Sequence, residues 1–494
     1  MLVLTTFRAV NSIMRAFSRA RPAPYRGRNS SCIWIFAFLT LVAGSLSAQS
    51  SDANIRWQPR ADIAAYTGKM LSWKDKVHLS LIASGAESGR IESYAKRIDE
   101  LAAQAREATA GLGPSDKADH LLQFLHSNAL KTYRFEQTRV DVLLDTGTFN
   151  CVSSAVIFNL LAESLGLKTA AVSTPDHAFS QIILPDRTVD VETTSALGFD
   201  PGQKRTFHDA FGKLTGFAYV PPGNYARRTS LDDRGLIALI LQNLMTQAQS
   251  RGDEATPVGL AWDNAALLGT PAAQTLLLRS YQNYLAGLND RGEYTKGLDI
   301  LSRLEALLGR SRETEQLFAA FGQNLIVGRL DSGDFAGAKE AVKSWGTRTT
   351  RSPAEWYSMI LKTQAQKLYQ ERGWAASFAW ISAQKSAEPG DVSAVSLSLA
   401  LQELEKRSAQ GDWAAALAFL ANLPADIRSK PEVVKFGDIL AYNGSVEYHN
   451  RFVSLMNQRQ TDQATAVLQE GLGRFPDSTV LQADKRKLAS IQRR

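Results

Sequence analysis

The stretch that decides the fold of this chain is DTGTFNCVSSAVIFNLLAESLGLKTAAVSTPDHAFSQIILPDRTVDVETT, residues 145–194. Residues 152–165 are apolar in almost every turn, which predicts a buried central helix, and Gly166 follows at the position of a left-handed C-cap. Three short strands separated by turns that contain Pro and Asp are expected after it, at 168–173, 178–184 and 188–192. A helix followed by an antiparallel sheet predicts an α+β domain.

The same stretch contains a cysteine, a histidine and a carboxylate in the order that an acyl-transfer triad uses. Cys151 opens the central helix, where unpaired backbone N–H groups favour a thiolate and could form an oxyanion hole. His177 opens the following strand and could take the thiol proton as a general base. Either residue alone is more simply interpreted as structural, Cys151 as a small buried hydrophobe and His177 as a turn residue. Their joint occurrence on these elements predicts nucleophilic catalysis.

Two carboxylates are candidates for the third residue of the triad. A tight turn at 185–186 sets Asp190 opposite Gln181 and Glu192 opposite Phe179. From the rise per residue of a strand, Glu192 is expected roughly 7 Å from the position of the histidine and Asp190 roughly 13 Å from it. Plain register therefore favours Glu192, whereas a longer or bulged connection favours Asp190.

Residues from about 90 to 200 resemble the transglutaminase-like domain of the papain-like cysteine fold, and also the bacterial SirB1-type branch of that superfamily. The nucleophile of the family falls on Cys151, its base on His177, and its carboxylate on Asp190 in the VDV of 189–191. The resemblance thus ranks Asp190 above Glu192 as the third catalytic residue. It implies acyl transfer or hydrolysis at amide or peptide bonds of a protein or peptide substrate.

Helices are expected on the N-terminal side of the triad stretch. Residues 52–115 read as helical, with one apolar face over 91–102, and a second helix is expected from Ser115 to residue 130. We expect His120 and His126 on this second helix to be structural. No metal-ligand spacing, phosphate-binding glycine loop or nucleotide motif occurs in the sequence, so neither a metal nor a cofactor is expected.

Residues 1–48 have the composition of a secretory signal peptide or an N-terminal anchor. Six Arg and no acidic residue accompany the apolar run 32–43, which is shorter than the roughly 20 residues that span a bilayer. We expect export to the periplasm or the medium, with no membrane span after cleavage; an uncleaved anchor is the alternative. Loss of the six Arg lowers the formal net charge from +7 to +1, so nothing favours nucleic acid as a partner. One cysteine then remains, which excludes an internal disulfide.

In residues 226–494 the strand signals disappear and a glycine followed by an aromatic residue recurs about every 40 residues. The instances are RGEY at 291–294, SGDF at 332–335, RGW at 372–374 and QGDW at 410–413. We predict TPR-like helical repeats in which each glycine ends one helix; an irregular helical bundle is the alternative. Such repeats are expected to bind a protein substrate or partner.

These observations predict three segments: a signal peptide or anchor at 1–48, a transglutaminase-like domain with a helical N-terminal subdomain at 49–225, and an all-α repeat domain at 226–494. Two functions remain open. One is an exported cysteine enzyme that uses Cys151, His177 and Asp190. The other is a non-catalytic scaffold whose repeats carry the function.

Overall fold

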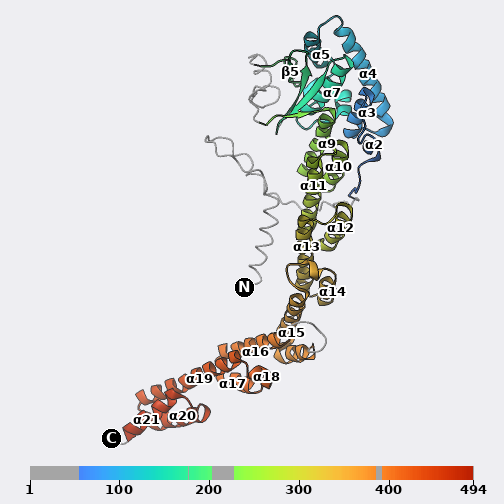
Figure 1. The fold of residues 1–494 in the computed structure, drawn as a ribbon. Helices are drawn as coiled ribbons and strands as arrows, with labels where there is room; N and C mark the ends of the chain where they lie inside the picture. The colour runs from blue at the N-terminus through green and yellow to red at the C-terminus, as the bar shows by residue number, and fades with distance from the viewer. Residues whose placement is uncertain (1–54, 176, 203–226, 385–391, 493–494) are drawn as a thin grey trace. The chain divides into compact units, whose positions relative to one another are not determined.

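In a computed structural model of the protein, residues 55–175, 177–202, 227–384 and 392–492 are described (Figure 1). The chain is mostly helical with a small sheet, and it divides into two compact units between Gly287 and Leu288. The boundary expected at 225/226 lies outside the described residues, as does the expected signal segment at 1–48. The first unit continues past that boundary because two further helices pack onto its core.

Helix α7 (Cys151–Ser164) lies at the centre of the first unit, between the sheet and a layer of helices (Figure 1). Its residues from Cys151 to Ala162 are all buried, as the apolar pattern predicted. The helices that contact α7 are α3 (Trp73–Ala83), α4 (Ile91–Ala108), α5 (Pro114–Asn128), α6 (Val140–Thr146) and α9 (Asp233–Ser250).

The sheet on the other side of α7 has the order β5-β4-β3-β6, and its pairs are antiparallel. Its strands are β3 (Thr169–Ser173), β4 (Ala178–Ile183), β5 (Thr188–Val191) and β6 (Thr229–Leu231). The first three confirm the expected strands, whereas β6 was not expected. The β4–β5 hairpin pairs Gln181 with Asp190 and contains no bulge, so the plain register is correct.

Local signals fix the ends of α7. The Asn150 side chain accepts hydrogen bonds from the backbone of Val152 and Ser153, and the Ser153 hydroxyl accepts one from the Asn150 N–H, which completes a capping box. Gly166 follows the helix with φ +77°, the left-handed conformation expected of it. Pro114 opens α5 after the N-cap Gly113, so the N-cap is not Ser115, as expected, but lies two residues before it.

Before α7, the chain forms a short parallel pair of strands that the sequence did not indicate. Strands β1 (Thr132–Tyr133) and β2 (Thr148–Phe149) pair residue for residue, and β2 leads directly into α7. The predicted helical stretch 52–115 is divided into α2 (Ala61–Ala64), α3, a 3₁₀ turn η1 (Ser88–Arg90) and α4. Helix α10 (Thr256–Leu268) packs against α9 and α2.

The second unit consists of helices that contact chiefly their neighbours in sequence, as a helical repeat does. The helices are α12 (Tyr294–Leu308), α13 (Arg312–Asp331), α14 (Phe335–Trp345), η3 (Gly346–Arg348), α15 (Pro353–Ala383), α16 (Val392–Ala409), α17 (Trp413–Ala421), α18 (Ala425–Arg428), α19 (Pro431–Asn457), α20 (Thr461–Arg474) and α21 (Thr479–Gln492). Helix α11 (Pro271–Asp290) contains the division between the units.

The recurring glycines have the same conformation at every instance of the motif. Gly292, Gly333, Gly373 and Gly411 have φ between 74° and 78°, and the aromatic residue follows within two positions at or near the start of the next helix. Gly373 interrupts α15 with non-helical φ and ψ, so α15 is two helices joined at a repeat turn. A repeated helix-turn-helix arrangement is therefore consistent with the structure. Among the described helices, none is both long and apolar enough to cross a membrane.

Candidate active site

Cys151 is the first residue of α7 and is 8% exposed. It is a free thiol, and the sequence holds one other cysteine, Cys32, which lies outside the described residues. The side chain of Cys151 lies near that of His177, which precedes β4, and its presence helps to raise the pKa of His177. The structure thus brings together the two residues that the sequence predicted as nucleophile and base.

His177 is held from its other side by Glu192. The His177 Nε2 and a Glu192 carboxylate oxygen are 2.5 Å apart, and both side chains are nearly buried, with 11% and 6% of their surface exposed. The second oxygen of Glu192 accepts hydrogen bonds from the hydroxyl and the backbone N–H of Thr194.

Asp190 is not the third member of this arrangement, which corrects the ranking that the family resemblance gave. Its carboxylate accepts two hydrogen bonds from the Arg228 guanidinium, at 2.8 and 3.0 Å, and one from Gln181 at 2.7 Å. The physical reason is the unbulged register of the β4–β5 hairpin, which leaves Asp190 opposite Gln181. Glu192, two residues further, lies at the level of His177, as the plain register indicated.

The environment of His177 favours its protonated form. Burial opposes the charge, but the negative charge of Glu192, the hydrogen bond to Glu192 and the interaction with Cys151 outweigh it, so the pKa of His177 is raised well above its ordinary value. The buried carboxylate of Glu192 therefore stabilises a positive charge on the imidazole beside Cys151.

Asn150 has a structural role at this site. Its Oδ1 caps α7, and its Nδ2 donates to the carbonyl of Phe135 at 3.0 Å. Both ends of the amide are therefore occupied, and the side chain is only 2% exposed. Asn150 fixes where the helix begins, and with it the position of Cys151.

His126 lies closer to the site than the sequence indicated. Its Nε2 is 3.1 Å from the carbonyl of Thr193, and its ring meets Phe149 edge-on. Burial lowers the pKa of His126, so it is neutral at neutral pH. His120, by contrast, is exposed and hydrogen-bonds within α5. The hydrogen bonds of His126 and His120 go to backbone carbonyls, those of Thr193 and Asp116.

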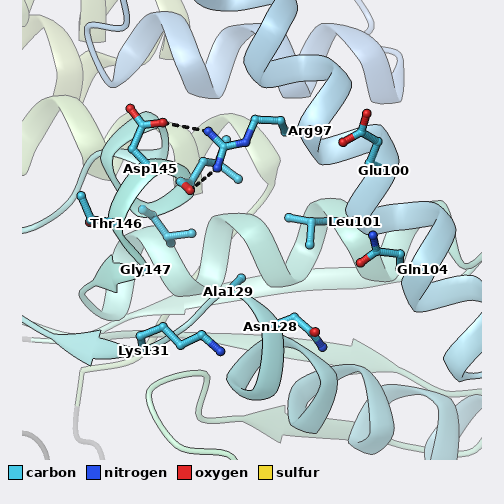
Figure 2. Close-up of a pocket in the computed structure, with 12 residues that line it drawn as sticks. Arg97, Glu100, Leu101, Gln104, Asn128, Ala129, Lys131, Asp145, Thr146 and Gly147 are labelled. Atoms are coloured by element: carbon cyan, nitrogen blue, oxygen red, sulfur yellow. Dashed lines mark hydrogen bonds and ion pairs between the residues drawn. The ribbon is translucent and has the colours of Figure 1, made fainter.

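A separate pocket of about 380 Å³ lies where α4, α5 and α6 meet (Figure 2). Arg97 reaches across it to Asp145, whose carboxylate also accepts from the hydroxyl of Tyr94 at 2.6 Å. Lys131 on the opposite wall donates to the Ser127 carbonyl. The pocket lining does not include Cys151, and its cationic groups already have protein partners, so we do not assign it to the reaction.

The described part of the chain contains no group of three or more His, Cys, Asp or Glu side chains that could hold a metal ion. In comparisons with known proteins, the chain matches no family model, and no curated protein matches it. Function is therefore inferred from the residues of the site.

Proposed function

We propose that this protein is a cysteine enzyme of transglutaminase-like type, which transfers or hydrolyses acyl groups at amide or peptide bonds. The observation that carries the proposal is the position of His177, between the Cys151 thiol and the buried carboxylate of Glu192. This chemistry requires a nucleophile beside a base, with a carboxylate that orients the base. Their placement at a helix N-terminus and on an adjacent antiparallel sheet supports the transglutaminase-like assignment.

In this mechanism His177 holds the thiol proton and Cys151 attacks the carbonyl carbon as a thiolate. The proton then passes to the leaving amine or alcohol, and a thioester on Cys151 remains. Water or an amine takes the acyl group in the second step. Glu192 keeps the imidazole oriented and stabilises its positive charge, and Thr194 in turn fixes Glu192 through two hydrogen bonds.

The helical repeats of the second unit are proposed to bind a protein substrate or partner. Repeat arrays use their extended surfaces for such contacts. We also propose that the protein is exported, on the strength of the Arg-rich and apolar composition of residues 1–48. Mass determination of the N-terminus of the protein recovered from the producing cell tests the second proposal, and an intact N-terminus on an internal protein would contradict it.

A non-catalytic scaffold is the second candidate function, and the low exposure of Cys151 favours it. A thiol with 8% of its surface exposed has limited access for a substrate. The two candidates differ in one property, which is the reactivity of Cys151 in the folded protein.

The deciding experiment is alkylation of Cys151 by iodoacetamide as a function of pH. The wild-type protein is compared with His177→Ala, Glu192→Gln and, as the matched carboxylate control, Asp190→Asn. We expect wild type to react below about pH 8.5, the range in which an ordinary thiol is still protonated. Loss of His177 or of the Glu192 charge should move the reaction to higher pH.

Asp190→Asn should leave the alkylation profile close to that of wild type, because Asp190 contacts Arg228 and Gln181 instead of His177. If Cys151 reacts only after the protein is unfolded in urea, the enzyme proposal is wrong and the scaffold is favoured. If Asp190→Asn shifts the profile as much as Glu192→Gln, the assignment of Glu192 is wrong.

A further inference from the structure

The proposed reaction needs hydrogen-bond donors for the oxygen that becomes negative when the thiolate attacks a carbonyl. Such donors are usually the largest single source of transition-state stabilisation in acyl transfer. The start of α7 was expected to supply them from its backbone. In the structure, most of the backbone N–H groups at the start of α7 already have acceptors.

The Asn150 side chain accepts hydrogen bonds from two of the N–H groups at the start of α7. Its Oδ1 accepts from Val152 and Ser153 at 3.0 Å each. The Ser154 N–H is committed to the Asn150 carbonyl at 3.0 Å. Of the first four N–H groups, only that of Cys151 has no acceptor among the described residues. One donor is therefore available from the backbone, and a second has to come from a side chain.

Tyr133 is placed beside Cys151 by the β1–β2 pair. It pairs with Phe149, and the two rings meet edge-on with centroids 5.8 Å apart. The Arg134 N–H donates to the Phe149 carbonyl at 2.8 Å, and Asn150 donates to the carbonyl of Phe135. These bonds tie the segment after Tyr133 to the residues that lead into α7.

The Tyr133 hydroxyl is half-buried and has no hydrogen-bond partner in the described part of the chain. Burial, followed by the negative charges of Cys151 and Glu192, raises the pKa of Tyr133, so the phenol remains a donor at neutral pH. The pairing of Tyr133 with Phe149, two residues before Cys151, places Tyr133 beside the start of α7. Two other polar side chains at the site already have partners, since His177 contacts Glu192 and Asn150 accepts from the start of α7.

We propose that the Tyr133 hydroxyl, together with the Cys151 N–H, donates to the oxyanion formed at Cys151. This inference rests on the proposed function, and it adds a catalytic residue from a segment that the sequence did not single out. As Sγ of Cys151 bonds to the carbonyl carbon, the carbonyl oxygen takes the electron pair and accepts both hydrogen bonds. When the carbonyl re-forms, the bond to the leaving group breaks and His177 returns the proton to it.

The test compares two reactions of the same thiol in the full-length protein. Alkylation by iodoacetamide is a displacement at saturated carbon and forms no oxyanion, whereas acylation by p-nitrophenyl acetate does. We expect Tyr133→Phe to alkylate at the wild-type rate but to acylate roughly 100-fold more slowly, the size of effect seen for one oxyanion donor. Tyr66→Phe, which removes a hydroxyl elsewhere in the same unit, serves as the control and should change neither rate.

Equal acylation rates for Tyr133→Phe and wild type would overturn the inference while leaving the proposed function intact. An equal loss of alkylation and acylation would also overturn it, because that pattern indicates that Tyr133 only positions Cys151. A wild-type protein inert to both reagents would overturn the proposed function and the inference together. Urea unfolding of each variant separates these results from a loss of folding.

Discussion

Gly198 is the position where the smallest change should have the largest effect on the site. A Cβ at this residue would lie 1.9 Å from the carbonyl oxygen of Glu192, 2.8 Å from its carbonyl carbon and 3.0 Å from its Cβ. Gly198 also accepts a hydrogen bond from the Glu192 N–H at 2.8 Å, so the two backbones are tied together. Gly198→Ala therefore requires one of them to move.

The size of the movement follows from these distances. Restoring the contact with the Glu192 oxygen from 1.9 to at least 3.0 Å needs a shift of about 1.1 Å. When the shift falls on Glu192, it breaks the 2.5 Å contact between Glu192 and His177. Overpacking of this kind costs about 1–3 kcal/mol of unfolding free energy. The catalytic geometry is more sensitive, because misplacement by about 1 Å can cost roughly 100-fold in rate.

The assay is the alkylation profile of Cys151 together with urea unfolding of Gly198→Ala. Gly89→Ala is the matched control, because a Cβ there meets nothing within 4 Å and its φ is not in the left-handed region. We expect Gly198→Ala to lose reactivity as Glu192→Gln does, and Gly89→Ala to retain it. A Gly198→Ala protein with wild-type alkylation and wild-type stability would refute the reasoning.

Four further predictions concern stability. Asp263→Ala should lower the unfolding free energy by about 2–3 kcal/mol. The loss is smaller than for a fully buried pair, because Asp263 is wholly buried but its partners Arg56 and Arg60 are about one-third exposed. An unchanged stability in urea unfolding would contradict this. Gly411→Ala should cost about 1 kcal/mol because its φ is 75°, whereas Arg459→Gly should be neutral or stabilising because Arg459 has φ 62° at the last repeat turn. Since the pKa of His177 is raised in the folded protein, its contribution is complete below about pH 6.5 and is lost as the pH rises, so His177→Gln should cost more stability at about pH 6 than at about pH 9. The reverse order in thermal or urea unfolding would show that the charged form is not the one stabilised.

The sequence predicted the elements whose signals are local. The apolar run and Gly166 indicated α7 and its end, and the turn at 185–186 indicated the β4–β5 hairpin. The short strands β1, β2 and β6 could not be predicted, because two or three residues carry no periodicity and depend on pairing partners distant in sequence.

At the candidate site, some residues could be found from the sequence pattern and others only from the three-dimensional arrangement. Cys151 and His177 were found because residue type and element order were both informative. The choice between Asp190 and Glu192 depended on register, and the register estimated from the hairpin turn was correct. Glu192 contacts His177, whereas Asp190, which the resemblance ranked first, contacts Arg228 and Gln181. Tyr133 had no signal in the sequence, because its proximity to Cys151 arises only from the β1–β2 pair.

The buried residues of the second unit fall into clusters that follow one another along the chain. They include the clusters of residues 326–360, 361–399, 400–440 and 448–488, whereas the first unit has one large cluster from Ile63 to Leu267. An array of this kind has no single cooperative centre, so its stability is close to a sum of local terms. Pulled from its ends in a single-molecule force measurement, the second unit should therefore extend in several small steps, with each step releasing one helix pair while its neighbours stay folded. A protein built in this way can yield to load gradually and recover segment by segment.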